Sequence, residues 1–314
     1  LKTRNKLDLD QELERIEAAG ARVLTWENPA YPRILHEIPA PPPVLYVKGT
    51  LTEEDDWAVA VIGTRRASSY GREATRRLTR ALARNGITIV SGMARGIDGE
   101  AHKAALEAGG RTIAVFGCGI DHIYPPEHRK LAEQIVAHGA VVSDYPLGTP
   151  PEGKNFPPRN RIISGLSLGV LVVEAGIRSG ALITVDYAAE QGRDVFAVPG
   201  SILARNSAGV NTLIQEGAKL VLNGEDVLEE LNLTMAVEQT QARQALPANE
   251  TEGALLSHLS AEPTHVDKLQ QQVELPIAQV TSTLALMELK GMVRQSGSMK
   301  YIIARESSVE YVVE

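Results

Sequence analysis

Cysteine is nearly absent from this chain of 314 residues, in which Cys118 is the only one. A single cysteine excludes an internal disulfide framework and a zinc site built from several cysteines. Such scarcity is typical of a reducing compartment, and we expect a cytoplasmic location. The seven histidines show no metal-ligand spacing. We therefore expect neither a metal ion nor a cofactor.

Long apolar runs are also missing. The longest suggestive stretch, Leu166–Val173, is much shorter than the roughly 18 residues of a membrane span, so we expect no membrane span. Hydrophobic residues make up 43% of the chain and charged residues 23%, which is typical of a globular protein. At about 150 residues per domain, this length predicts roughly two domains. The chain starts at Leu1 and not at Met, and we expect an N-terminal region to be missing.

The sequence has no excess of positive charge. Its 32 basic and 39 acidic residues give a net charge of −7. This balance excludes the basic surface that extends over many nucleic-acid-binding domains. If the chain binds a polyanion, it must do so through a local patch.

Two segments differ in pattern before residue 234. Residues 9–20 predict a helix, and residues 21–50 a proline-rich approach in which Pro41–Pro43 exclude helix and sheet interior. Residues 51–233 then alternate apolar runs with helical patterns. The predicted strands are Ala58–Ile62, Ile87–Ser91, Thr112–Phe116, Ala140–Ser143, Leu168–Val173, Val195–Val198 and Lys219–Leu222. The predicted helices are 71–85, 97–108, 127–138, 159–165, 180–191, 209–216 and 225–231. Apolar strands separated by helices predict an α/β fold with a doubly wound parallel sheet.

A smaller unit is predicted near the C-terminus. Residues 234–250 are polar and indicate a linker, and residues 307–314 form a tail. Between them, residues 251–306 show helical patterns at 251–260, 265–272 and 276–290. Two short strands follow, Met292–Gln295 and Lys300–Ile303, with Gly297 in the turn. Three helices and a hairpin are typical of a winged helix-turn-helix.

Glycine-rich loops follow four of the predicted strands: Gly63–Gly71, Gly92–Asp98, Gly117–Gly119 and Glu174–Gly180. Ligands of open parallel sheets bind outside the carboxyl ends of the strands. Glycines let backbone N–H groups approach an anion there, and helix N-termini favour negative charge. The pattern indicates a phosphate-binding edge, although each loop alone is also compatible with an ordinary tight turn.

Three sequence features resemble known nucleotide-binding or catalytic sites but do not meet the requirements of those sites. Gly148–Asn155 resembles a P-loop, but Asn155 replaces the Ser or Thr that holds magnesium. Gly165–Gly169 spells a nucleophile elbow, but a helix precedes it and a strand follows, which is the reverse of the required order. Cys118 lies between two glycines, where a small buried side chain is a better interpretation than a nucleophile.

Basic residues cluster in two places. Arg72, Arg76, Arg80 and Arg84 recur on one face of the predicted helix 71–85, where a solvated face is the simplest interpretation. The second cluster, Lys154–Arg161, contains Phe156. A ring within a basic loop suits single-stranded nucleic acid, because charges follow the phosphates and a base stacks on the ring.

Several motifs together closely resemble the DprA/Smf family (DNA processing protein A), over about residues 10–232. They are Gly63-Thr-Arg-Arg-Ala-Ser-Ser-Tyr-Gly71, Ser91-Gly-Met-Ala-Arg-Gly-Ile-Asp98, Phe156-Pro-Pro-Arg-Asn-Arg-Ile-Ile-Ser-Gly-Leu-Ser167, Val198-Pro-Gly-Ser201 and Ser207-Ala-Gly-Val-Asn-Thr-Leu-Ile-Gln-Glu-Gly-Ala218. The resemblance implies an extended Rossmann-like core that forms a homodimer, followed by a winged-helix domain. It implies a non-enzymatic role, in which the protein binds and protects incoming single-stranded DNA in natural transformation and loads the RecA recombinase onto it.

The same resemblance implies the site. Arg65 matches the arginine that contacts DNA phosphate in the family, and Lys154 corresponds to a loop lysine that contacts DNA. Phe156, Arg159, Asn160 and Arg161 match the family's Phe-Pro-x-Arg-Asn-Arg segment. The candidate DNA-binding residues are Arg65, Arg66, Ser91, Gly92, Lys154, Phe156, Arg159, Asn160, Arg161, Ser179 and Gly180. No catalytic residue is assigned.

Two alternatives remain open. The first is a Rossmann-type nucleotide-processing enzyme resembling phosphoribohydrolases, with Glu174 as catalytic residue, although that group's Pro-Gly-Gly-x-Gly-Thr motif is absent. The second makes the C-terminal unit a reader of double-stranded DNA. Its presumed recognition helix offers only Lys290 against Glu288, which favours a surface that faces another protein.

Overall fold

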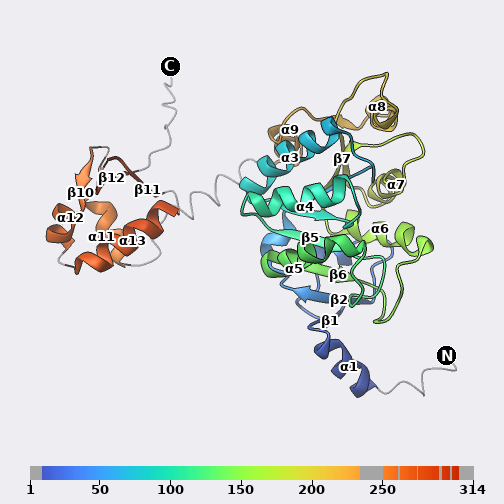
Figure 1. The fold of residues 1–314 in the computed structure, drawn as a ribbon, viewed down its shortest axis with the longest axis horizontal. Helices are drawn as coiled ribbons and strands as arrows, with labels where there is room; N and C mark the ends of the chain where they lie inside the picture. The colour runs from blue at the N-terminus through green and yellow to red at the C-terminus, as the bar shows by residue number, and fades with distance from the viewer. Residues whose placement is uncertain are drawn as a thin grey trace. The chain divides into compact units, whose positions relative to one another are not determined.

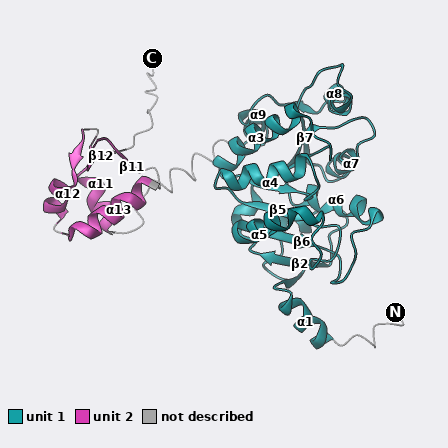
Figure 2. Ribbon diagram, in the orientation of Figure 1, with its two compact units in different colours: residues 1–233 teal, residues 234–314 magenta. Residues whose placement is uncertain are grey.

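The computed structural model describes residues 9–233, 250–260, 262–273, 275–289, 292–297 and 299–303. The chain divides into two compact units, residues 1–233 and 234–314 (Figure 2). The predicted tail, most of the predicted linker and Lys290 lie outside the described residues.

A nine-stranded sheet forms the centre of the first unit, in the order β1-β2-β6-β5-β4-β3-β7-β8-β9 (Figure 1). The strands are β1 Arg22–Thr25, β2 Val44–Gly49, β3 Ala58–Gly63, β4 Thr88–Ser91, β5 Thr112–Val115, β6 Gly139–Ser143, β7 Gly169–Glu174, β8 Asp194–Ala197 and β9 Lys219–Leu220. Strands β3 to β9 are mutually parallel. The α/β class with a mostly parallel sheet is confirmed.

Strands β1 and β2 were not predicted, because residues 21–50 were interpreted only as a proline-rich approach. The two strands pair antiparallel with each other, and β2 pairs antiparallel with β6. Every proline of the segment lies between them and none within them, so the prolines do not interrupt the pairing. In β2 the side chains of Leu45 and Val47 are buried and Tyr46 is half-buried, which is the alternation of a strand.

Helices cover both faces of this sheet. They are α1 Leu9–Ala18, α2 Arg33–His36, α3 Ser69–Arg84, α4 Ile97–Glu107, α5 Arg129–His138, α6 Phe156–Gly165, α7 Leu182–Glu190, α8 Ala208–Gln215 and α9 Glu225–Glu230. Helix α4 packs beside α3 and α5 on one face, and α6 packs beside α7 on the other. The strands supply both cores by alternation: Ile113 and Val115 face the α6 layer, and Ala114 faces the α5 layer.

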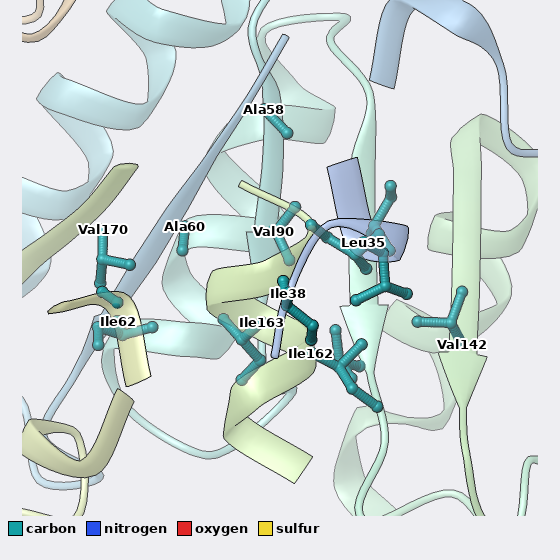
Figure 3. Close-up of a cluster of buried hydrophobic side chains, with 14 of the residues drawn as sticks. Leu35, Ile38, Ala58, Ala60, Ile62, Val90, Val142, Ile162, Ile163 and Val170 are labelled. Atoms are coloured by element: carbon teal, nitrogen blue, oxygen red, sulfur yellow. The ribbon is translucent and has the colours of Figure 1, made fainter. Parts of the chain in front are cut away.

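The α6 layer holds the largest apolar cluster. Figure 3 shows Ile162 and Ile163 of α6 beside Ile62 of β3 and Leu35 and Ile38 of the N-terminal segment. Burial of such side chains contributes about 1.5–3 kcal/mol each. This packing fixes α6 against the sheet, and with α6 the segment that contains Phe156 at its start.

The strand order reverses at β3. From β3 the chain builds β4, β5 and β6 outward on one side, and it then returns to place β7 on the other side of β3. The connections that follow β3 and β7 therefore lead to opposite sides of the sheet. Ligands of open α/β sheets bind at the carboxyl ends of the strands where such a reversal occurs.

The second unit has its own core. It comprises α11 Glu250–Ser257, β10 Thr264–His265, α12 Val266–Val273, α13 Ile277–Leu289, β11 Val293–Gln295 and β12 Lys300–Ile303. The three strands form an antiparallel sheet in the order β10-β12-β11, of which β10 was not predicted. Leu255, Leu269 and Leu284 from the three helices are fully buried together. The arrangement is that of a winged helix, as predicted.

Candidate nucleic-acid interface

Three loops are tied together at the carboxyl ends of β3, β4 and β7. The N–H of Thr64 donates to the carbonyl of Glu174 at 2.7 Å, and the carbonyl of Thr64 accepts from the N–H of Ile97 at 3.2 Å. Gly96 has φ of 78°, and a Cβ there would lie 2.3 Å from the carbonyl oxygen of Thr64. Only glycine permits this approach. The loops after these strands therefore form one connected edge.

A groove of about 440 Å³ lies on this edge. It is lined by residues from the β3 loop, the start of α6 and the loop before α7. Seven of the predicted site residues line it: Arg65, Arg66, Phe156, Arg159, Asn160, Ser179 and Gly180. The fold thus brings together residues that are more than a hundred positions apart in the sequence.

Arg65 and Arg66 supply the free positive charge of the groove. Both side chains are exposed, and neither forms an ion pair with any residue that the structure describes. Arg95, on the neighbouring loop, is instead paired with Glu127. An unpaired guanidinium can hold a phosphate with two parallel hydrogen bonds, so these two arginines are the groove's candidate anion-binding groups.

Arg159 lines the groove with a buried side chain. Its side chain is only 4% exposed, and its guanidinium donates to the carbonyl of Gly92 at 3.1 Å and to that of Val115. Burial lowers the pKa of Arg159 to about 10, an effect that nearby Asp98 opposes. Nη1 of Arg159 thus bonds the ends of β4 and β5, so Arg159 supports the floor of the groove. Asn160, also buried, accepts from Arg159 Nε at 3.3 Å.

Phe156 forms an aromatic platform with Tyr124. The ring of Phe156 is half-buried and stacks on Tyr124 with centroids 5.8 Å apart and planes inclined by 30°. The guanidinium carbons of Arg65 and Arg159 lie 5.5 and 5.8 Å from the Phe156 centroid, within cation–π range. Tyr124 is 38% exposed. The sequence analysis missed Tyr124, and the only signal for it was an aromatic residue in a loop after a strand.

Two predicted cations lie outside the lining of the groove. Lys154 is exposed, and its ammonium pairs with Glu152 at 2.6 Å. Arg161 is largely buried, and its guanidinium pairs with Asp144 at 2.6 Å. Both charges are thus partly compensated by carboxylates of the protein itself.

Ser91 and Gly92 lie below the edge. The hydroxyl of Ser91 is fully buried and donates to the carbonyl of Val61 at 2.7 Å, which links β4 to β3. Gly92 lines a small cavity next to Arg65 and Phe156. Among the predicted residues, Ser91 is therefore a structural link and Gly92 makes room for its neighbours.

The groups considered for catalysis have structural partners. The carboxylate of Glu174 is 2% exposed and accepts from the N–H of Ser68 at 2.8 Å, at the start of α3. Cys118 is buried and donates to the carbonyl of His122, and burial raises the pKa of its thiol to about 11. A thiol with that pKa is a weak nucleophile.

Among the described residues, no group of three or more His, Cys, Asp or Glu is placed to hold a metal ion. No described helix has the length and apolar character to cross a membrane.

Comparison with known proteins identifies the family of this chain. Residues 22–232 match the family model described as DNA recombination-mediator protein A, and residues 239–298 match the DprA winged helix domain. The chain is 40% identical to the Protein Smf of Synechocystis over 95% of this chain and 84% of that protein.

Two solved structures are similar. The structure of DNA processing protein A from Streptococcus pneumoniae has a TM-score of 0.67 and 44% identity, covering 72% of this chain and 79% of that one. DNA processing protein A from Helicobacter pylori has a TM-score of 0.60 and 32% identity, covering 67% of this chain and 95% of that one, and its structure describes a single-stranded DNA binding mode. The chain therefore belongs to the DNA recombination-mediator protein A family, which includes proteins named DprA and Smf.

Proposed function

We propose that the chain binds single-stranded DNA in the groove at the carboxyl edge of the sheet. The observation that carries this proposal is that two arginines without an ion pair among the described residues, Arg65 and Arg66, lie beside the Phe156–Tyr124 platform. Helices α6 and α7 both begin at the groove. The N-terminus of α7 favours an anion, whereas Pro157 and Pro158 remove two N–H donors from the first turn of α6. The guanidinium groups add positive charge.

The platform favours single strands over duplex. Unpaired bases can stack on an exposed ring, whereas the bases of a duplex are already stacked on one another. Stacking of this kind tolerates every base, because each has a π-face. The single-stranded DNA binding described for the Helicobacter pylori relative supports this choice.

The cellular role that we propose follows from family membership. The protein binds and protects incoming single-stranded DNA in natural transformation, and it loads the RecA recombinase onto that DNA. It acts in the cytoplasm as a homodimer. An observation compatible with pairing is the edge strand β9, beside which Leu220 and Leu222 are 40% and 66% exposed.

We favour a binding protein over a nucleotide-processing enzyme. The enzyme alternative needs Glu174 as a reacting group. The carboxylate oxygen Oε2 of Glu174 instead accepts from Ser68 N, and a Cβ at Gly71 would lie 2.3 Å from that same oxygen. This close packing at the start of α3 supports a fixed, non-catalytic carboxylate.

A binding titration tests the proposal. The full chain is titrated against a fluorescent 25-nucleotide thymidine strand, a blunt duplex of the same length, and a mononucleotide. We expect the strand to bind tightest and its affinity to fall with salt, since counterions are released. Equal or tighter binding of the duplex contradicts the proposal. RecA loading is tested separately, by the rate of RecA-dependent ATP hydrolysis on the strand with and without this protein.

A further inference from the structure

A second cavity, of about 530 Å³, opens at the same edge of the sheet. It lies between the start of α3 and residues 200–207, and none of its lining residues lines the groove. Its size is within the range of small-molecule sites. Glu174, Tyr70, Arg205 and Asn206 contribute to its wall.

Glu174 gives this cavity an unusual acceptor. The side chain is 2% exposed, yet it forms no ion pair with any residue in the described part of the chain. Asp55, which is also buried, pairs with Arg111 at 2.9 Å. Among the described residues, the one hydrogen-bond donor to the Glu174 carboxylate is the backbone N–H of Ser68, which bonds one of its two oxygens. A carboxylate has about four lone-pair sites, so Glu174 retains capacity for donors from a ligand.

The other wall groups suit a nucleotide. The hydroxyl of Tyr70 donates to the carbonyl of Pro199 at 2.6 Å, which fixes a ring that is 51% exposed. Arg205 is exposed and has no ion pair among the described residues. The cavity therefore combines a fixed aromatic ring, a free guanidinium and a buried acceptor.

A hydrogen bond links the cavity to the groove. Asn206 Nδ2 donates to the carbonyl of Arg66 at 3.1 Å, so the loop that lines the cavity contacts the turn that carries the groove's arginines. The loop of the cavity is therefore a direct neighbour of the turn that carries Arg66.

We propose that this cavity binds a guanine base of the bound strand. Guanine presents two adjacent donors, N1–H and the N2 amino group, and can bond a carboxylate in the same bidentate way as a guanidinium. Adenine and cytosine offer a single amino group on that edge, and the N3–H of thymine lies between two carbonyl oxygens that a carboxylate repels. Tyr70 stacks on the base and Arg205 contacts a phosphate. This inference rests on the proposed single-stranded DNA binding and adds a base preference at one position.

The test compares two strands of 25 nucleotides, one all thymidine and one with a single central deoxyguanosine. A lone guanine avoids four-stranded structures. We expect the guanine strand to bind the full chain about five- to tenfold more tightly. This ratio should fall to one in Glu174→Gln, which keeps the shape but replaces an acceptor with a donor, and in Ala204→Phe, which fills the cavity. Leu203→Ala, on the same loop but outside the lining, is the matched control and should keep the ratio.

The outcomes separate this inference from the proposed function. A ratio of one in the unmodified chain, with thymidine binding intact, overturns the guanine site alone. A failure to bind either strand overturns the proposed function. A ratio that persists in Ala204→Phe also overturns the guanine site, even if Glu174→Gln fails to fold. In a further outcome, free dGMP but not dTMP raises the melting temperature, while the two strands bind with equal affinity. That result would mean that the cavity binds a free nucleotide and not a base of the bound strand, which overturns the inference.

Discussion

Among single residues, His102 shows how one buried group couples the fold to pH. Its side chain is fully buried in α4, with Nδ1 2.7 Å from the hydroxyl of Thr112. That hydroxyl already donates to the carbonyl of Ile89 at 2.7 Å, so Nδ1 must carry the proton and donate. Nε2 is then unprotonated and buried, and it has no hydrogen-bond partner among the described residues. Burial, with a smaller effect of His128, lowers the pKa of His102 to about 3.

We expect His102 to weaken the fold in acid. The unfolded histidine titrates at about 6.5, so below that pH the unfolded state binds a proton that the folded state rejects. The free energy of unfolding should therefore fall as the pH drops from about 6.5 toward 3, by at most about 1.4 kcal/mol per pH unit from this group. Urea unfolding of the chain and of His102→Gln at pH 7.5, 5.5 and 4.5 measures the slope. His138→Gln, at an exposed site, is the control. An identical slope in His102→Gln would falsify the assignment.

Arg65 should account for one phosphate contact. Because its guanidinium is exposed and unpaired among the described residues, Arg65→Ala should weaken binding to every single strand. The slope of log affinity against log salt should flatten by about 0.7. Fluorescence anisotropy at several salt concentrations measures both effects. Arg84→Ala, at the far end of α3, is the matched control and should change neither. An unchanged slope in Arg65→Ala would mean that Arg65 does not contact a phosphate.

Phe156 should contribute through stacking and not through charge. Phe156→Ala should cost about 1–3 kcal/mol of binding free energy and leave the salt slope unchanged. Its ring is half-buried, so the melting temperature should fall only modestly. Tyr124→Ala, which removes the other half of the platform, should act in the same direction. If Phe156→Ala instead costs the 3–5 kcal/mol of stability that is typical of a core phenylalanine and keeps its affinity when folded, the stacking role is wrong.

Among the elements, helix α3 shows how carboxylates compensate part of a basic helix face. Arg76 pairs with Glu100 at 3.0 Å and with Glu73 at 3.2 Å, and Arg80 pairs with Glu107. Two of these carboxylates belong to α4, which packs beside α3. The arginine repeat that the sequence shows is therefore partly a contact between helices, made by Arg76 and Arg80. Arg72 and Arg84 of the same repeat are exposed and form no ion pair among the described residues.

Helix α13 leads to a prediction about the second unit. Within Ile277–Leu289 the only charged residue is Glu288, which suits neither grooves nor phosphates of duplex DNA. A chain shortened to residues 1–233 should bind the thymidine strand within about twofold of the full chain. Gel-shift titration of both proteins measures the ratio. A large loss of affinity in the shortened chain would assign DNA contacts to the second unit.

The elements differ in how far the sequence predicts them. Residues 58–62 of β3 and 170–173 of β7 are apolar throughout, and glycine-containing loops follow both strands, so their place in a buried parallel sheet and the chemistry of their loops could be inferred. β1 and β2 were not inferred, because both are short and the proline-rich connection between them dominates the pattern of residues 21–50. The burial of Arg159 was equally hidden, since it depends on carbonyls of Gly92 and Val115 that only the fold brings near. Tyr124 joined the site for the same reason.

For the whole molecule, the division into two units predicts how the chain unfolds. Each unit has its own buried apolar cluster, and the cluster of the second is much the smaller. Small cores are marginally stable, so we expect the second unit to melt separately. Scanning calorimetry should resolve two transitions, and the shortened chain 1–233 should retain only the larger. One transition for the full chain, with a single calorimetric enthalpy, would show that the units unfold together.

The pairing of β2 with β6 has a consequence for synthesis on the ribosome. Tyr46 pairs with Ser143, so the first two strands emerge long before the strand that they must join. Until then, Leu45 and Val47 have no sheet in which to be buried. A nascent chain that pauses before residue 143 exposes a two-stranded ribbon, which is marginal on its own and open to pairing with other chains. Chaperones that shield apolar segments would find their earliest substrate there, because β2 is made early and must wait for β6 before it is paired on both sides.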